Sequence, residues 1–587
     1  MTLPDPSSPP VAPLEDFPVV PMRVTGKMGR AAGSGAAWMM SATVFTKILT
    51  FVAQIVLGSL LTRDDFGLFA MAVATTKFVT ICQDGGVRDL LVQRGLGDYE
   101  KFSGRVFWFA MCFNLVVATL VAAVAWPVAN LWFKDDRLVN LLLVLALSVP
   151  LGTPGAVLNS KLRLDFNFAA TSWVMILSGV VRQVGTVSLA LAACGSMSFV
   201  VPAVLAAIVE SAASWWFSRD TPWKRAPEFG TWIDLFKQAK WLIFGSVANL
   251  LIDRGPYLVM QPFLVLGGVN VALATGVLGE YFWAFEVTAQ LGVLLSYNMQ
   301  LVLMPVLSRF KDDIPRLRDA TIRSMSGLMM MGSFSSLAMA VMMDPLEGLI
   351  FNGKWANATP AVAVFGLFFP FRILYGLTTA VQLAMNQSRT WCLLSFAEGI
   401  AFTLAGAVVA IVAAKGWMGT LVGVDAASLA WATGGTLAIV RIFATLWVMR
   451  QIGARRRAVL VEMIWPWLLA VLSAAIAHSL DAWLNLEGLV TRRWDVEKAV
   501  CEITIGNSDG FAGWFVAIVQ GWGLNARADA AIIEGTRLVL LGLTITIAFG
   551  VLARVLMPDM LREACRVAPG PFGRLGRRFL RLARDKG

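Results

Sequence analysis

The chain has 587 residues, of which 57% are hydrophobic and 15% charged, with a mean hydropathy of +0.69. Soluble domains carry about 25% charged residues, so this composition excludes a soluble globular protein and indicates an integral membrane protein. The net charge of +11 does not indicate nucleic-acid binding, because the basic residues are scattered between apolar segments and carry topology information. The six cysteines form no CxxC pair, and we interpret them as packing residues that belong to neither a metal site nor a disulfide framework.

Residues 1–35 contain seven prolines and no apolar h-region, so we expect a flexible cytoplasmic tail without a cleavable signal peptide. About 14 apolar segments of spanning length follow. They are expected at 36–60, 66–87, 104–128, 138–157, 169–192, 197–218, 241–266, 279–306, 322–343, 358–382, 390–414, 425–449, 462–485 and 531–557.

Lysine and arginine are concentrated in every second loop, and this bias places both termini in the cytoplasm. The sequence therefore predicts an all-α integral membrane protein with two six-helix bundles around a central cavity and a C-terminal helix pair. The expected parts are a disordered cytoplasmic tail (1–35), an N-terminal bundle (36–220), an interfacial cytoplasmic linker helix (221–240), a C-terminal bundle (241–450), an extra transmembrane pair (451–560) with an extracytoplasmic loop (486–530), and a basic amphipathic cytoplasmic tail (561–587).

The segment 241–266, WLIFGSVANLLIDRGPYLVMQPFLVL, carries charge near its middle. Asn249, Asp253 and Tyr257 share one helix face, and Pro256 should kink or break the helix. A broken helix with ionisable groups at mid-membrane is typical of transporters that bind a substrate or a coupling ion there. The alternative is a buried Asp253–Arg254 pair that only joins two helices.

Six cations lie inside the predicted spans, and each would cost roughly 2.5–3.5 kcal/mol at the bilayer centre if it faced lipid. They are Lys47, Lys77, Arg182, Arg254, Arg372 and Arg441. The acidic groups of the same spans are Asp84, Glu210, Asp253, Glu280, Glu286 and Glu398. Arg182 with Glu210, and Glu398 with Arg441, lie on consecutive helices, and we interpret both as structural ion pairs.

The remaining charges are mostly cationic and lie on polar helix faces that also carry Gln54 and Gln290. One such face could join two helices, but five of them, on the first, second, seventh, eighth and tenth helices, favour an aqueous cavity. We therefore predict a cavity that binds an anionic cargo such as a phosphate, pyrophosphate or acidic sugar. The expected substrate-binding residues are Lys47, Lys77, Arg254, Arg372, Gln54, Asn249, Tyr257 and Gln290, and the ion-coupling candidates are Asp253 and Glu286.

An internal repeat relates the two bundles: residues 58–70 and 276–284 each join one helix to the next, and Gly67 matches Gly279. The stretch GAAWMMSATVFTKILTFVAQIVLGSLLTRDDFGLFAMA and the later DGGVRDLLVQRG resemble the N-terminal signature of bacterial polysaccharide exporters. These are lipid-linked oligosaccharide flippases of the multidrug/oligosaccharidyl-lipid/polysaccharide superfamily. Further matches are Asn249 with Asp253-Arg254, Gly279 with Tyr281, and Phe351-Asn352-Gly353-Lys354-Trp355.

The resemblance implies two bundles that open alternately to each side of the membrane and carry an undecaprenyl-pyrophosphate-linked oligosaccharide for exopolysaccharide, O-antigen or capsule assembly. It implies an anionic lipid-linked cargo, membrane lipids, and polysaccharide polymerase or assembly proteins as partners, with no nucleic acid and no cofactor.

Two rival hypotheses remain. A multidrug exporter of the same superfamily would need an acidic cavity, and a membrane glycan ligase or glycosyltransferase would need positioned acids or bases. His478 and the carboxylate pairs Asp64-Asp65 and Asp135-Asp136 are better explained by packing and helix capping, so we expect no enzyme.

Overall fold

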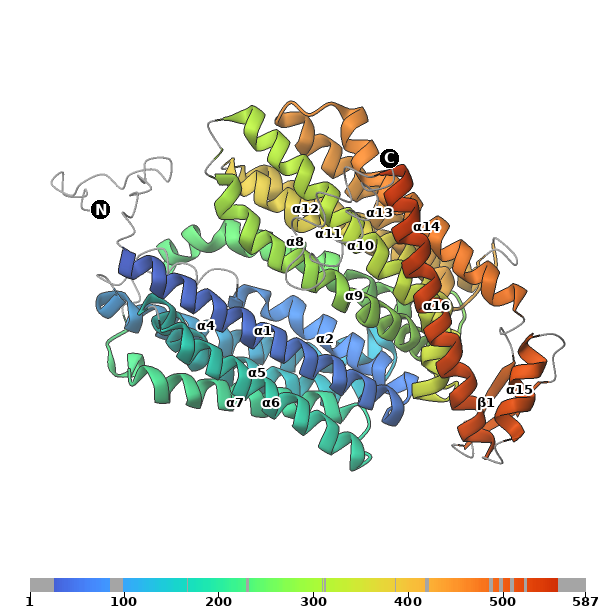
Figure 1. Ribbon diagram of the computed structural model, residues 1–587. Helices are drawn as coiled ribbons and strands as arrows, with labels where there is room; N and C mark the ends of the chain where they lie inside the picture. Colours follow the sequence, from blue (N-terminus) through green and yellow to red (C-terminus); the bar gives the residue numbers. More distant parts are fainter. Residues whose placement is uncertain are drawn as a thin grey trace.

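The computed structural model describes residues 26–84, 99–165, 167–227, 232–308, 310, 313–385, 387–417, 422–484, 489–495, 500–506, 511–521 and 525–557. The first six long helices pack on one another as one lobe (Figure 1). They are α1 (Gly26–Leu60), α2 (Arg63–Asp84), α4 (Tyr99–Pro127, continued by the π-helical η2, Val128–Phe133), α5 (Arg137–Leu164), α6 (Phe168–Leu191) and α7 (Met197–Ser218), and the short η3 (Pro222–Lys224) follows.

The next six helices form a second lobe beside the first (Figure 1). They are α8 (Trp232–Leu266), α9 (Val271–Ser308), α10 (Ile314–Phe351), α11 (Thr359–Ala384, preceded by η5, Ala356–Ala358), α12 (Ser388–Lys415) and α13 (Ala426–Gln451). Two more long helices, α14 (Arg456–Trp483) and α16 (Ala526–Leu556), pack on each other and on α10. Between them lie an antiparallel hairpin of β1 (Val490–Asp495) and β2 (Val500–Ile505), and the short helix α15 (Phe511–Gly521).

Over the described residues, each of the 14 segments predicted from apolar length lies in one of these long helices, apart from a few residues at some ends, so the all-α membrane fold is confirmed. Eleven helices are long and apolar enough to span a membrane when only the described residues are considered. Helices α2, α8 and α9 are not among the eleven, so the total of 14 spans stays a prediction. Helix starts follow side-chain chemistry: Asn167, Asp313, Asp425 and Asn525 each accept a hydrogen bond from the backbone N–H three residues ahead.

The structure differs from the sequence predictions at several places. Helix α1 begins at Gly26, ten residues before the expected start, and residues 232–240 of the predicted linker are the first part of α8. Helix α8 continues through Pro256 without a break, since flanking helices can support a membrane helix that lacks one backbone bond. The loop 486–530 contains the unpredicted hairpin. The predicted basic amphipathic tail, 561–587, lies outside the described residues.

Glycines let α8 pack closely on α12 and so fix how α8 is rotated. A Cβ added at Gly255 would lie 1.9 Å from the Thr403 hydroxyl, and one at Gly399 would lie 3.0 Å from the Ala248 carbonyl oxygen. Only glycine allows such close backbone approach. This contact directs the neighbouring Asp253 and Arg254 side chains away from α12 and toward other helices, as described below.

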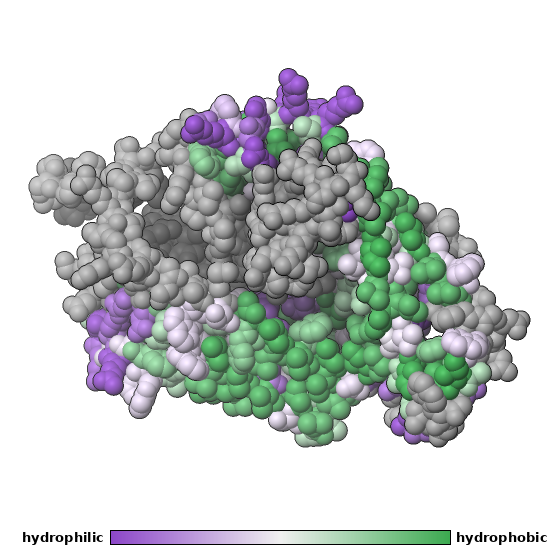
Figure 2. Space-filling model, viewed as in Figure 1, coloured by the Kyte–Doolittle hydropathy of each residue, from purple (hydrophilic) through white to green (hydrophobic). Residues whose placement is uncertain are grey.

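The outer surface suits a lipid environment. Large apolar side chains are exposed along the helices, for example Ile48 (58%), Val116 (66%) and Val555 (70%). Figure 2 shows that apolar side chains cover much of the visible face, with hydrophilic ones gathered at its upper edge and lower left corner. An apolar band between polar ends is typical of a multi-pass membrane protein.

A buried arginine attaches the C-terminal helix pair to the second lobe. Arg537 on α16 donates to both carboxylate oxygens of Asp481 on α14, over 2.7–3.1 Å, and to Asp344 on α10 at 2.8 Å. Glu534 lies 3.9 Å from the same guanidinium. Since Arg537 and Asp481 are both buried, this cluster fixes α14 and α16 against α10.

Candidate functional site

Two adjacent residues of α8 reach in different directions to charged partners. Arg254 donates to Glu286 on α9, with 2.6 Å between its Nη1 and the carboxylate Oε1. Its neighbour Asp253 accepts a hydrogen bond from Arg372 on α11. Asp253 remains 54% exposed, so water reaches its carboxylate. Four of the predicted site residues therefore meet in two ion pairs that tie α8 to α9 and α11.

Aromatic rings surround both arginines. The Arg254 guanidinium carbon lies 5.7 Å from the ring centroids of Tyr257 and Phe282, and that of Arg372 lies 5.0 Å from the ring of Phe285. These distances permit cation–π attraction, which stabilises a cation away from bulk water. Tyr257 itself is only 1% exposed, so it packs beneath Arg254 as a core residue instead of lining a cavity as predicted.

A second polar cluster lies deeper in the second lobe. Arg441 on α13 pairs with Glu398 on α12, and both side chains are almost fully buried. The Arg441 guanidinium also lies 4.6 Å from the ring centroid of Tyr375, whose hydroxyl donates to Asn249 on α8. Asn249 therefore belongs to a hydrogen-bonded network that joins α8, α11, α12 and α13. Glu398 and Arg441 are therefore ion-pair partners, and a purely structural role for them stays a prediction.

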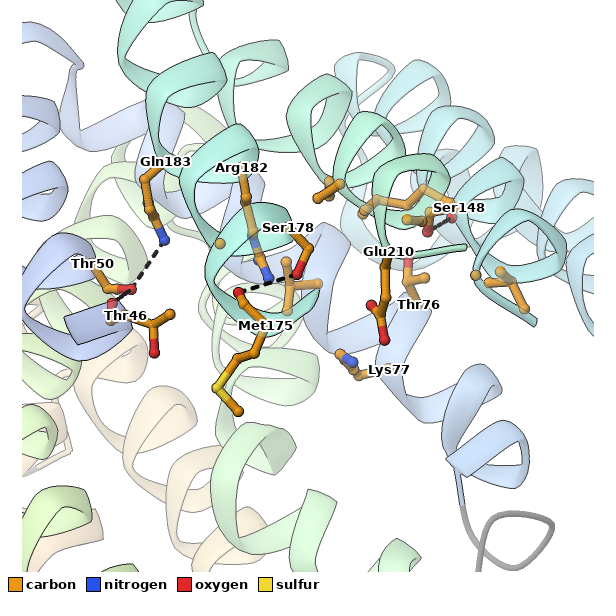
Figure 3. Close-up of a pocket in the computed structure, with 18 of the residues that line it drawn as sticks. Thr46, Thr50, Thr76, Lys77, Ser148, Met175, Ser178, Arg182, Gln183 and Glu210 are labelled. Atoms are coloured by element: carbon orange, nitrogen blue, oxygen red, sulfur yellow. Dashed lines mark hydrogen bonds between the residues drawn. The ribbon is translucent and has the colours of Figure 1, made fainter. Parts of the chain in front are cut away.

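The first lobe contains an open cavity of about 440 Å³. Helices α1, α2, α5, α6 and α7 line it, and nine of its lining residues are polar. The charged ones are Lys77, Arg182 and Glu210. Figure 3 shows the carboxylate of Glu210 pointing toward the Lys77 amine, with Arg182 in another part of the lining. A wet cavity can hold such charged groups without exposing them to lipid.

This arrangement differs from the predicted Arg182–Glu210 ion pair. Within the described part of the chain, no hydrogen bond or ion pair engages the Arg182 guanidinium, and its electrostatic neighbours are Arg254 and Glu286 of the second lobe. The difference arises because α7 packs against α5 as well as α6, so Glu210 faces the cavity and α2. Arg182, predicted to be structural, thus interacts electrostatically with charged groups of the second lobe.

The other predicted residues are more dispersed. Lys47 is half-buried on α1, next to the cavity-lining Thr46. Gln54 faces a small apolar crevice between α1, α9 and α10, where its carbonyl oxygen has no hydrogen-bond partner in the described part of the chain. Gln290 is half-buried on α9, one turn beyond Glu286. Gln54 therefore lies between the two lobes.

Sequence reasoning missed Gln183 and Ser178 on α6, which also line the cavity. The Gln183 amide donates to Thr50 on α1 at 3.1 Å and ties the two helices together beside the cavity. Ser178 and Arg182 stand four residues apart on one helix face, and this polar face could have been recognised in the sequence.

The two lobes meet closely where α1 turns into α2. We call this region the closed end; it comprises residues 58–67, 275–283 and 351–355. Arg63 pairs with Glu280 across the lobes at 2.8 Å, and the Trp355 indole donates to the Gly58 carbonyl at 2.8 Å. Gly67 and Gly279, matched as repeat equivalents, are in direct contact, because a Cβ on Gly279 would lie 2.9 Å from the Gly67 nitrogen.

Lys354 gives the closed end a pH dependence. Its amine donates to the Ser59 carbonyl at 2.8 Å, and burial lowers its pKa from 10.5 to about 8, against the opposing effect of the Asp65 carboxylate. When the end opens, the pKa should return toward 10.5, so the open state binds the proton more tightly. The closed end should therefore gain stability as pH rises from about 8 toward 10.5, and its pH dependence should vanish below pH 8.

Spin labels at Ser59→Cys and Ala356→Cys test this expectation. Both residues are exposed, Ser59 on α1 of the first lobe and Ala356 on η5 of the second. Electron–electron distance measurements should show a larger population of the short distance at pH 10 than at pH 7.5. Lys354→Met should remove the difference. An equal pH response in the Lys354→Met protein would show that another group is responsible.

Comparison with known proteins identifies relatives. The sequence profile of a family described as polysaccharide biosynthesis protein matches residues 56–360. The succinoglycan biosynthesis transport protein ExoT of Rhizobium meliloti (strain 1021) is 23% identical over 334 residues, which are 56% of this chain and 64% of the relative. The lipopolysaccharide biosynthesis protein WzxC of Escherichia coli (strain K12) is 22% identical over 337 residues, 56% of this chain and 65% of the relative. The matches thus span just under two thirds of these relatives.

Solved structures show the same fold. The lipid II flippase MurJ in an inward closed conformation superposes with a TM-score of 0.62 at 12% identity, covering 88% of this chain and 98% of MurJ. A multidrug resistance transporter of the MATE family, in an inward-facing conformation, superposes with a TM-score of 0.55 at 14% identity, covering 69% of this chain and 94% of the transporter. These likenesses confirm the predicted superfamily fold. Because the family profile covers more than half of the sequence, this multi-pass membrane protein belongs to the polysaccharide biosynthesis protein family.

Proposed function

We propose that the protein is a flippase, a transporter without enzymatic activity, for an undecaprenyl-pyrophosphate-linked oligosaccharide used in surface polysaccharide assembly. The names of the relatives ExoT and WzxC support transport and polysaccharide synthesis. The observation that carries the proposal is the charged face of α8, where adjacent residues hold ion pairs to two different helices beside the boundary between the lobes.

The interior keeps a cationic surplus in this arrangement. Of the six carboxylates in the same spans, Glu280 pairs with Arg63 at the closed end and Asp84 is the last residue of α2. The six cations therefore stand against four carboxylates, Glu210, Asp253, Glu286 and Glu398. A pyrophosphate would bind Arg254 and Arg372 in place of Glu286 and Asp253, because both anions use the same guanidinium donors. The displaced carboxylates would then be free to take up a proton or bind a cation, which makes Asp253 and Glu286 the coupling residues. The same surplus disfavours a cationic drug as cargo.

The closed end fits the extracytoplasmic side of such a transporter, with both termini in the cytoplasm of a bacterial inner membrane. In this orientation the cargo enters from the cytoplasmic side, where lipid-linked oligosaccharides are made. Separation of the closed end, with the lobes meeting at the opposite end, would release the glycan to the polymerase and other assembly proteins. The lipid tail would remain in the bilayer throughout.

Export of surface glycan by an Arg254→Gln variant tests the proposal. Loss of a charge-assisted contact to the pyrophosphate should reduce export about ten- to a hundredfold, with the protein still present in the membrane. Since Arg254→Gln leaves Glu286 unpaired, an Arg254→Gln/Glu286→Gln double variant should restore stability without restoring export. Arg316→Gln, at an arginine whose side chain is 75% exposed, serves as the surface control. Full export by both Arg254 variants would remove Arg254 from the cargo site.

A further inference from the structure

The cavity of the first lobe has the composition of a carbohydrate site. Nearly half of its lining side chains are polar, and most of these carry hydroxyl or amide groups. Its volume of about 440 Å³ lies within the range of about 300–1,000 Å³ typical of small-molecule pockets. All of its lining residues belong to the first lobe, so the cavity is separate from the arginine pairs of the second lobe.

The charges of the cavity leave one cation available. Glu210 and Lys77 point toward one another, so their charges offset (Figure 3). The Arg182 guanidinium makes no hydrogen bond or ion pair in the described part of the chain, and the charges of Arg254 and Glu286 in the second lobe act on it in opposite directions. The Arg182 side chain lines the cavity and is exposed there, so its guanidinium donors are accessible to an anionic ligand.

Uncharged polar groups of the lining add a second observation. Thr76 is only 6% exposed, and its hydroxyl has no hydrogen-bond partner in the described residues. Ser178 donates to a carbonyl of its own helix, which leaves its oxygen lone pairs available to accept from a ligand. A sugar hydroxyl both donates and accepts, so it can satisfy such groups together.

We propose that this cavity is a subsite for a sugar residue that bears a carboxylate, with Arg182 binding that carboxylate. The inference rests on the proposed function, because the sugar belongs to the oligosaccharide of the cargo. One guanidinium can donate two parallel hydrogen bonds to one carboxylate. The net charge of the cavity lining, +1 from Lys77, Arg182 and Glu210, balances the single negative charge of that carboxylate. The pyrophosphate carries more charge and is met by the two arginines of the second lobe.

The test uses the full-length protein in lipid nanodiscs and two disaccharides that differ only in one carboxylate, cellobiose and its glucuronic acid-terminated counterpart. Binding is measured by saturation-transfer NMR titration. The wild-type protein should bind the acidic disaccharide at least tenfold more tightly than cellobiose. Arg182→Gln should lower the affinity for the acidic disaccharide about ten- to a hundredfold and leave the affinity for cellobiose unchanged. Arg182→Lys should retain part of the affinity for the acidic disaccharide. Arg316→Gln is the surface control and should bind like the wild type.

Equal binding of the two disaccharides by the wild-type protein would overturn the subsite. So would binding of the acidic disaccharide by Arg182→Gln with the same affinity as by the wild type. Inorganic pyrophosphate separates this inference from the proposed function. Arg182→Gln should keep most pyrophosphate binding and Arg254→Gln should lose it. If pyrophosphate fails to bind the wild type while the acidic disaccharide binds through Arg182, the flippase proposal fails and the subsite stands.

Thermal unfolding of each variant identifies folding defects. If Arg182→Gln does not fold, Thr76→Val and Ser178→Ala take its place, since they keep the charge of the cavity. Each should lower the affinity for both disaccharides by the same few-fold factor, because one neutral hydrogen bond is lost. No effect of either substitution on either disaccharide would place the sugar outside this cavity.

Discussion

Gly279→Ala is expected to abolish glycan export by preventing assembly of the closed end. A Cβ at Gly279 would lie 1.8 Å from the Arg63 carbonyl oxygen and 2.8 Å from its carbon, and both atoms belong to the backbone of α2. At Gly67, a Cβ would lie 2.1 Å from the Thr275 carbonyl oxygen on α9. Backbone atoms in packed helices cannot move aside as a flexible side chain can, so α2 and α9 would be forced apart.

The matched control is Gly327→Ala on α10, where an added Cβ meets nothing within 4 Å. Both substitutions exchange a helical glycine for alanine and favour the helix by about the same amount. Glycan export should fall to background only for Gly279→Ala, and the short distance between spin labels at Ser59→Cys and Ala356→Cys should be lost. Export by Gly279→Ala equal to that of Gly327→Ala would show that the glycine contact is dispensable.

Breaking the ion pair between Arg441 and Glu398 is expected to cause the largest loss of stability. The two side chains are only 4% and 2% exposed, so either partner left alone is a buried, uncompensated charge. Such losses typically amount to about 3–5 kcal/mol. Glu398→Gln and Arg441→Met should each lower the midpoint of thermal unfolding in detergent and reduce the amount of protein in the membrane.

The double variant Glu398→Leu/Arg441→Met distinguishes a charge effect from a packing effect. Removing both charges removes the unpaired ion, so the double variant should unfold at a higher temperature than either single variant. A double variant as unstable as the sum of the single variants would indicate that shape, not charge, governs this site. Arg318→Met, at an exposed ion pair with Asp319, should have almost no effect.

Helix positions could be predicted because apolar length is a local property of the sequence. The segment 197–218 was expected as a span, and α7 has the same bounds. Ion-pair partners could not be predicted as well, because they depend on helix rotation and on which helices become neighbours. Arg372 pairs with Asp253 across 119 positions of the chain, whereas Arg182 and Glu210, on consecutive helices, do not face each other as expected.

The internal repeat relates two glycines that are in contact in the structure. Gly67 and Gly279 were matched as equivalent positions of the two halves, and the structure brings these equivalents into contact. Equivalent positions meet in this way when two repeats face each other across an approximate two-fold axis. The hairpin of β1 and β2 was not predicted, although two short strand-forming segments separated by a short connection favour such a pair.

The contacts of Arg537 determine which part of the protein the hairpin follows. Arg537 and its carboxylates join α14 and α16 to α10, and α15 packs against α16. The hairpin and α15 are therefore attached to the second lobe through α16, and any tilt of that lobe would move them with it. A protein bound to the hairpin or to α15 would therefore be displaced whenever the second lobe tilts.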